Sequence, residues 1–237
     1  MYKTVLIDLD DTLWATQRNN KEAIHELYLS EGWSSSFPSF DAFWANYYPY
    51  NESLWHRYRH GEISKMELTL QRLRQPLLPV KAYSDEELLA INDRFLRITS
   101  AKSGVVEGAI ELLEYLKTLY QIVIVSNGFV EVQHRKMASA GLTKYVDVTV
   151  LSEDVGVSKP YKGIFDKALS LSHTRRGEAI MIGDSWDADI IGAQNSRLPS
   201  IWFNPNNVPF PMPQEELRYP VYVVHKLDEI PSLLRKI

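Results

Sequence analysis

Residues 5–13 read Val5-Leu6-Ile7-Asp8-Leu9-Asp10-Asp11-Thr12-Leu13, a short apolar run that ends in a cluster of carboxylates. The apolar residues predict a buried strand, and side chains two positions apart along a strand point to the same side. Asp8 and Asp10 can therefore face one small volume, where two like charges need a counter-ion. A hard divalent cation such as Mg²⁺, bound by carboxylates together with substrate phosphate and water, meets that need. The stretch alone is equally consistent with an acidic turn that only caps the following helix.

Three later segments place further polar groups at the ends of predicted strands or in a loop. The run Ile122–Val125 is followed by Ser126-Asn127-Gly128, a hydroxyl and a turn whose backbone N–H groups can bind phosphate. A lone lysine, Lys159, precedes a proline, and the run Ala179–Ile182 ends in Gly183-Asp184-Ser185-Trp186-Asp187-Ala188-Asp189. Each fragment alone is an ordinary turn or loop. Their joint occurrence, in the order acid, hydroxyl, lysine, acid, argues against a purely structural role for the set.

The segment after the first motif is predicted to be a helical insert. Residues 16–100 show helical periodicity and no strand runs. Two capping boxes predict helix starts inside this segment, because Ser64 is followed by Glu67 and Ser84 by Glu87. We therefore expect an all-helical domain here.

The rest of the chain is predicted to be an α/β core made of residues 1–15 and 101–237. The predicted elements are helices over 107–117, 130–140 and 163–169 and strands over 122–125, 146–151, 179–182 and 221–224. Such alternation is typical of a parallel sheet with helices on both faces. In open sheets of this kind ligands bind beyond the carboxyl ends of the strands, where all four motifs lie.

With these four motifs in this order, the chain resembles the haloacid dehalogenase (HAD) superfamily of aspartate-nucleophile phosphohydrolases over nearly its whole length. The resemblance implies a Rossmann-like core, a helical cap of the C1 type and Mg²⁺ as the cofactor. It implies the nucleophile Asp8, the general acid and base Asp10, the phosphate ligands Ser126, Asn127 (through its backbone N–H) and Lys159, and the Mg²⁺ ligands Asp8, Asp10 (through its carbonyl) and Asp184. Asp189 would orient the lysine or a metal-bound water, and Asp187 is the alternative for this second acid.

The chemistry of phosphate esters explains these residue types. A carboxylate and a phosphate dianion repel each other, so a lysine and a divalent cation have to neutralise charge before attack. A second carboxyl group can then protonate the leaving alcohol and later take a proton from water. In the superfamily that the chain resembles, the dehalogenases carry a non-acidic residue two positions after the nucleophile. The resemblance therefore implies that Asp10 favours phosphate-ester cleavage over 2-haloacid dehalogenation.

Within the superfamily, the chain resembles a bacterial pyrimidine 5′-nucleotidase group in residues 54–64, 126–129 and 151–160. The resemblance implies hydrolysis of nucleoside monophosphates, and a sugar-phosphate or phosphoglycolate phosphatase is the main alternative. The cap is expected to select the leaving group. Most aromatic residues of the cap are expected to pack within it. Trp14 and Phe129 are the candidate substrate contacts, because each follows a catalytic loop.

Composition agrees with a folded enzyme. The chain has 237 residues, 45% of them hydrophobic, a net charge of −4 and no cysteine. Dispersed basic residues argue against binding of a nucleic-acid polymer, and disulfides and thiolate metal sites are excluded. No signal peptide or membrane span is recognisable, so a soluble, cytoplasmic protein is expected. The expected partner is a small-molecule phosphate ester, and the sequence does not determine the oligomeric state.

Two hypotheses from other classes share part of this pattern. A receiver-like signalling module also combines paired acids, a hydroxyl and a lysine around Mg²⁺, but the length of the insert and Asp10 argue against it. A catalytically silent binding protein on the same scaffold is disfavoured because every expected catalytic residue is present.

Overall fold

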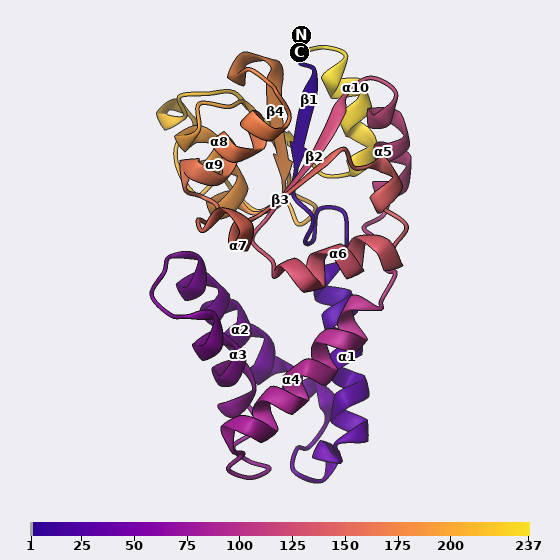
Figure 1. The fold of residues 1–237 in the computed structure, drawn as a ribbon, viewed down its shortest axis with the longest axis vertical. Coiled ribbons are helices and arrows are strands. Elements are labelled where there is room, and N and C mark those ends of the chain that lie inside the picture. Colours follow the sequence, from indigo (N-terminus) through magenta and orange to yellow (C-terminus); the bar gives the residue numbers. More distant parts are fainter. Residues whose placement is uncertain (1) are drawn as a thin grey trace. The chain divides into compact units, whose positions relative to one another are not determined.

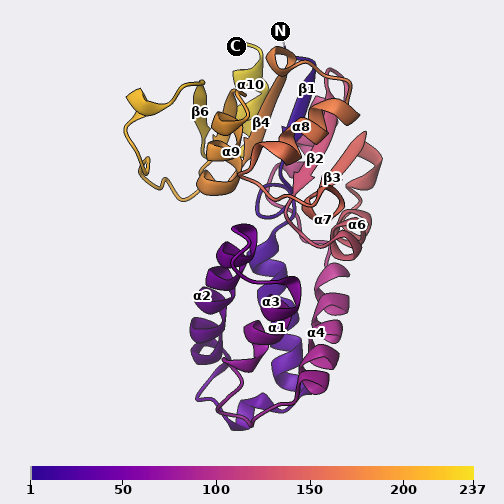
Figure 2. The same ribbon diagram turned by 60° about the vertical axis from the view of Figure 1, so that its left-hand side comes forward.

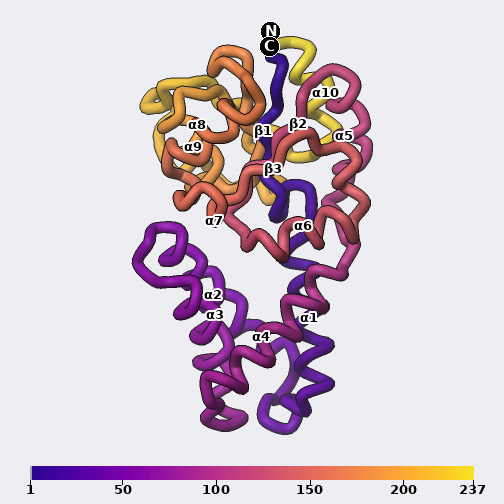
Figure 3. Tube along the Cα trace, in the orientation of Figure 1, coloured from indigo at the N-terminus to yellow at the C-terminus, as the bar shows by residue number. Residues whose placement is uncertain are grey.

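The computed structural model describes residues 2–237, which form two compact units. The first unit runs to Thr16 and resumes at Ser103, and the second comprises Gln17–Lys102. The chain leaves the first unit after β1 (Thr4–Ile7) and returns to it after the last helix of the second (Figure 3). The first unit is called the core below and the second the helical unit.

The core contains a parallel six-stranded sheet with the strand order β3-β2-β1-β4-β5-β6. Figure 1 labels the first four strands of the chain, β1 to β4. The remaining strands are β2 (Gln121–Ser126), β3 (Val148–Leu151), β4 (Ala179–Gly183), β5 (Ser200–Phe203) and β6 (Val221–Val224). β1 lies between β2 and β4, with Leu6 opposite Val123 and Met181. The carboxyl ends of these three strands therefore meet at one edge of the sheet.

Helices cover both faces of the sheet (Figure 1). They are α5 (Ala109–Lys117), α6 (Val130–Ser139), α7 (Ser152–Val155), α8 (Lys162–Leu171), α9 (Ile191–Asn195) and α10 (Ile230–Leu234). Side chains alternate along the strands: Val5 and Ile7 pack in one apolar cluster with α5 and α10, and Leu6 packs in another with α8 and α9. Burial on both faces explains why these strands read as continuous apolar runs. Each such buried side chain contributes about 1.5–3 kcal/mol of transfer free energy.

The structure differs from the predicted elements at several places, and the short helices α7 and α10 were not predicted. β5 (Ser200–Phe203) was not predicted. β3 begins at Val148 rather than Val146, which closes a 3₁₀ turn. α5 begins after Gly108, whose φ of 81° lies in the left-handed region and ends the preceding turn. Between β5 and β6 the chain forms a long irregular loop (Figure 2).

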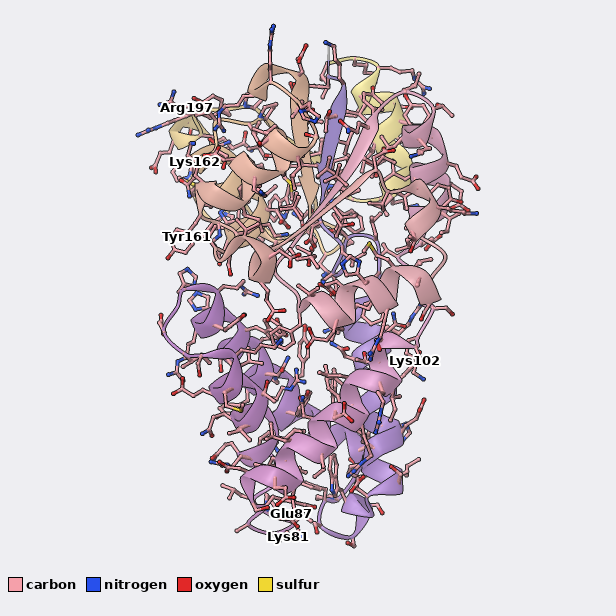
Figure 4. All side chains as sticks on the ribbon, viewed as in Figure 1. Lys81, Glu87, Lys102, Tyr161, Lys162 and Arg197 are labelled. Atoms are coloured by element: carbon pink, nitrogen blue, oxygen red, sulfur yellow. The ribbon has the colours of Figure 1, made fainter. Side chains whose placement is uncertain are left out.

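The helical unit consists of α1 from Gln17 on (the helix spans Thr16–Ser30), α2 (Phe40–Arg59), α3 (Lys65–Arg74) and α4 (Asp85–Ser100) with short connections. Both predicted capping boxes are confirmed at the starts of α3 and α4. Ser84 Oγ accepts from the Glu87 N–H, and Glu87 accepts in return from the Ser84 N–H at 2.8 Å. The Glu87 side chain also accepts from Lys81 at 2.6 Å, and the two side chains lie together in Figure 4.

Aromatic side chains fill the interior of the helical unit. Trp33, Phe43 and Tyr47 are almost fully buried, and Phe43 stacks on Tyr47 with ring centroids 5.7 Å apart. The prediction that most aromatic residues of this segment pack within it is confirmed for Trp44, Tyr47 and Tyr48, which belong to or pack against this cluster. Across residues 2–237, the structure contains no helix with the length and apolar character needed to cross a bilayer.

Candidate active site

The centre of the site is an ammonium group held by two buried carboxylates. Lys159 Nζ lies 2.5 Å from Asp8 Oδ1 and 2.7 Å from Asp189 Oδ1, and it donates to the Val125 carbonyl at 2.7 Å. Asp8 directly follows β1, and its N–H donates to the Ile182 carbonyl of β4 at 2.9 Å. The central strands therefore fix the backbone of Asp8, and the lysine fixes its side chain.

Asn127 holds the backbone of this lysine. Its Oδ1 accepts from the Lys159 N–H at 2.7 Å, and its Nδ2 donates to the Lys159 carbonyl at 3.0 Å. This pair of hydrogen bonds ties the turn after β2 to the loop before α8. Sequence reasoning assigned only the backbone N–H of Asn127 a function, so the role of its side chain in placing the lysine was missed.

A second acidic group stands beside Asp8. Thr12 Oγ1 lies 3.0 Å from Asp184 Oδ1 and 3.5 Å from Asp8 Oδ2, so one hydroxyl connects the ends of β1 and β4. One carboxylate oxygen from each of Asp8, Asp184 and Asp189 lies within 4.8 Å of the others. Hard oxygen donors at this spacing suit a divalent cation such as Mg²⁺.

Asp189, rather than Asp187, reaches the lysine. Asp189 is fully buried and its Oδ2 accepts from the Ser185 N–H at 3.1 Å, whereas Asp187 is exposed. A π-helical turn over Trp186–Ile190 directs Asp189 inward. Gly183 leaves the required space, because a Cβ at that position would lie 2.2 Å from Asp189 Oδ2.

Burial and the closeness of other carboxylates raise the pKa values of Asp8 and Asp184. The pKa of Asp8 is raised to about 7, chiefly by burial; Lys159 lowers it, and the nearby Asp189 and Asp10 raise it. Burial and the adjacent Asp8 raise the pKa of Asp184 well above its usual range. The carboxylates Asp189 and Asp8 raise the pKa of Lys159, against the effect of burial. The single lysine therefore leaves negative charge that a bound cation would neutralise, so the donor set fits Mg²⁺.

Asp10 lies beside this cluster with donors on both carboxylate oxygens. Its Oδ1 accepts from Lys136 Nζ at 2.6 Å and from Thr16 Oγ1 at 2.7 Å, and its Oδ2 accepts from Gln133 Nε2 at 2.5 Å. Ser126 Oγ lies 3.4 Å from Oδ2. Lys136 and its neighbours lower the pKa of Asp10 against the effect of burial. Sequence reasoning missed Lys136 and Gln133, whose only signal was a three-residue spacing on the helix after the Ser126 turn.

The two candidate substrate contacts are buried side chains. Trp14 has no exposed surface and packs in the apolar cluster of the core, with Lys136 Nζ 4.4 Å from its ring centroid. Phe129, which precedes α6, is 3% exposed. Trp14 therefore packs in the core next to Lys136, the residue that binds Asp10.

This fold and this arrangement of acids, hydroxyl and lysine define a phosphatase of the HAD superfamily. A family model for haloacid dehalogenase-like hydrolases matches residues 2–197, and the chain belongs to that family. It is 29% identical to the pyrimidine 5′-nucleotidase YjjG of Escherichia coli, with 98% of this chain and 97% of the relative covered. It is 27% identical to the pyrimidine 5′-nucleotidase PynA of Streptococcus pneumoniae, with 99% and 96% covered.

Solved structures agree with this assignment. The HAD-hydrolase YfnB of Bacillus subtilis, in a crystal form bound to magnesium, matches with a TM-score of 0.85, 26% identity and 98% of each chain covered. The L-2-haloacid dehalogenase of Xanthobacter autotrophicus matches with a TM-score of 0.75 and 18% identity, with both chains fully covered. At that identity the second match shows the shared fold alone.

Magnesium is expected to stabilise the protein more at pH 8 than at pH 5. Asp8 has a pKa of about 7 in the folded protein and an ordinary value of 3.8, so between these values the folded protein binds more protons than the unfolded chain. Its contribution to stability therefore falls as the pH rises through this window. A cation needs the ionised carboxylates, so saturating Mg²⁺ should raise Tm by about 3–10 °C at pH 8 and by less at pH 5.

Calorimetry in EDTA and in Mg²⁺ at both pH values measures this difference. The Asp184→Asn variant is the control, because it removes one of the three acids and should lose most of the gain at pH 8. An equal gain at both pH values, or an undiminished gain in Asp184→Asn, would contradict the assignment of the cation site.

Proposed function

We propose that the protein is a Mg²⁺-dependent phosphomonoester hydrolase that works through an aspartyl-phosphate on Asp8, and that its substrates are pyrimidine nucleoside 5′-monophosphates. The observation that carries the proposal is that Asp8 shares the Lys159 ammonium with Asp189 and lies in one carboxylate cluster with Asp184 and Asp189. A structural ion pair needs one acid for one lysine. Three acids around one lysine, at the open edge of a parallel sheet, are the arrangement of a site that binds a cation and an anion together.

Asp8 acts as the nucleophile of the proposed reaction, and Asp10 transfers the protons. An Asp8 oxygen forms a bond to phosphorus while the bond from phosphorus to the leaving alcohol oxygen breaks, and Asp10 in its acid form gives that oxygen a proton. Water then attacks the aspartyl-phosphate, Asp10 takes a proton from it, and inorganic phosphate leaves with Asp8 restored. The ion pair with Lys136 favours ionised Asp10, which is the form that accepts the proton. The approach of a phosphate dianion favours the acid form.

Lys159 and the bound cation would neutralise the negative charge of the phosphate group. Lys159 would contact the phosphate oxygens from its place beside Asp8, and Ser126 and the N–H of Asn127 would donate to them. Asp8, Asp184 and the carbonyl of Asp10 would hold Mg²⁺, which supplies charge stabilisation on the phosphate oxygens when bound. Asp189 would keep Lys159 directed at Asp8.

The relatives support the choice of substrate. Two of them are pyrimidine 5′-nucleotidases that match nearly the whole of both chains. A sugar phosphate is the second candidate, because the chain is also 30% identical over 87% of its length to a ribulose-1,5-bisphosphate 5-phosphatase of Halopiger xanaduensis.

A substrate panel tests the proposal. Nucleoside monophosphates, sugar phosphates, phosphoglycolate and 2-chloropropionate would be compared in Mg²⁺ by release of phosphate or chloride. We expect pyrimidine deoxynucleotides to lead, with kcat/KM at least about tenfold above the other esters, and no release of chloride. Equal rates on all esters would remove the nucleotidase assignment and leave the phosphatase. Leading rates on sugar phosphates would favour the second candidate, and absence of phosphate release would defeat the proposal.

A further inference from the structure

Helix α6 supplies two buried donors to the group that transfers the proton. Lys136 reaches Oδ1 of Asp10 and Gln133 reaches Oδ2, so the two oxygens are held from one helix. The two residues are three positions apart and lie on the same face of α6. A carboxylate gripped at both oxygens cannot turn about its terminal torsion without losing a hydrogen bond.

Each donor is itself fixed. The side chain of Lys136 is 8% exposed, and its ammonium group lies 4.4 Å from the centroid of the Trp14 ring, a cation–π distance. Gln133 is fully buried, and its Nε2 also donates to Ser126 Oγ at 2.6 Å. The Gln133 amide therefore connects Asp10 with the hydroxyl that is proposed to bind phosphate.

The turn after β2 is shaped to admit Gln133. A Cβ on Gly128 would lie 2.2 Å from Gln133 Nε2 and 2.3 Å from its Cδ, so only glycine leaves room for this side chain. The Gly128 N–H donates to Ser126 Oγ at 3.1 Å. A larger residue at position 128 would therefore displace the Gln133 amide from this position.

We propose that Lys136 and Gln133 are positioning residues for the acid and base Asp10: they hold its carboxylate in the orientation that reaches the leaving oxygen and, later, the attacking water. This rests on the proposed phosphatase reaction, and neither residue is assigned a contact with substrate. An alternative role is stabilisation only, since a buried ion pair whose partner is removed destabilises a protein whatever its function. Kinetics that depend on the leaving group separate the two roles.

The first test compares two esters in the first turnover. A nucleoside monophosphate needs a proton on its leaving alcohol, whereas p-nitrophenyl phosphate has a leaving group that needs none. For Lys136→Met we expect the first-turnover rate on the nucleotide to fall about 10- to 100-fold with KM nearly unchanged, and the p-nitrophenol burst to change by less than about threefold. Lys136→Arg should recover part of the loss, and Arg135→Met, an exposed cation on the same helix, should behave as wild type.

Equal losses on the two esters, or a loss confined to KM, would overturn the positioning role. So would an unchanged nucleotide rate in Lys136→Met when the wild type is active. A wild type that cleaves neither ester is a different result, because it defeats the proposed function itself. Thermal melts of each variant show whether it is folded at the assay temperature.

The second test is a double-mutant cycle with Asp10→Asn. If Lys136 and Gln133 act through Asp10, then Lys136→Met and Gln133→Met should each lower the nucleotide rate in the wild-type background and change it by less than about twofold in the Asp10→Asn background. The same fold-loss in both backgrounds would show that the helix residues act independently of Asp10 and would sink the proposal.

Discussion

Replacing Asp8 with asparagine is expected to lower kcat by at least about 10³-fold on every phosphate ester that the protein cleaves, because the variant has no carboxylate to attack phosphorus. The substitution keeps the size of the side chain. Asparagine can still accept a hydrogen bond from Lys159, which lies 2.5 Å from Asp8 Oδ1 in the native protein. The loss should therefore appear in kcat, with the protein folded.

The matched control is Asp187→Asn, which changes the same functional group at an exposed position of the last acidic motif. It should keep kcat within about twofold of wild type. Steady-state rates and the mass of acid-quenched protein give the two readouts: wild type should show a fraction carrying one added phosphoryl group, and Asp8→Asn none. A phosphorylated Asp8→Asn protein, or one with more than a few per cent of wild-type activity, would eliminate the covalent role of Asp8.

Replacing Lys159 with methionine is expected to reduce both activity and stability. The lysine is the cation that the structure places between Asp8 and Asp189, and both partners are almost fully buried. Without it the two carboxylates face each other, and removing one member of a buried ion pair typically costs about 3–5 kcal/mol of unfolding free energy. Because protonation of Asp8 relieves the repulsion, the loss should be larger at pH 8 than at pH 5. Activity should fall at least about 10²-fold.

Urea unfolding at both pH values and kcat on the best ester measure these effects. Lys167→Met is the control, because Lys167 is an exposed lysine of α8, the helix that follows the loop of Lys159. It should change the free energy of unfolding by no more than about 0.5 kcal/mol. A Lys159→Met protein as stable as wild type at pH 8 would show that the cluster does not depend on this cation.

The part of the site that lies at strand ends could be predicted from the local sequence. Asp8, Ser126 and Asp184 each lie at or directly after the end of a strand, and parallel pairing brings those ends to one edge of the sheet. Their proximity could therefore be predicted from apolar runs and the polar residues after them. Their catalytic roles remain proposals.

The remaining contacts depend on packing that no short pattern encodes. Lys136 and Gln133 reach Asp10 only because α6 lies with one particular face toward the end of β1, and a lysine and a glutamine on a helix are ordinary surface residues in a sequence. The side chain of Asn127 grips a lysine 32 positions later in the chain.

The hydrogen bonds between Asn127 and Lys159 also affect how readily the protein deamidates. An asparagine followed by glycine is the dipeptide most prone to deamidation, in which the glycine nitrogen attacks the asparagine amide carbon and ammonia departs. Here the Asn127 Nδ2 is bound to the Lys159 carbonyl and the Gly128 N–H is bound to Ser126 Oγ, so neither reacting group is free to close the succinimide ring. The native loop thus protects its own weakest amide, and the damage would be confined to molecules in which this loop has opened.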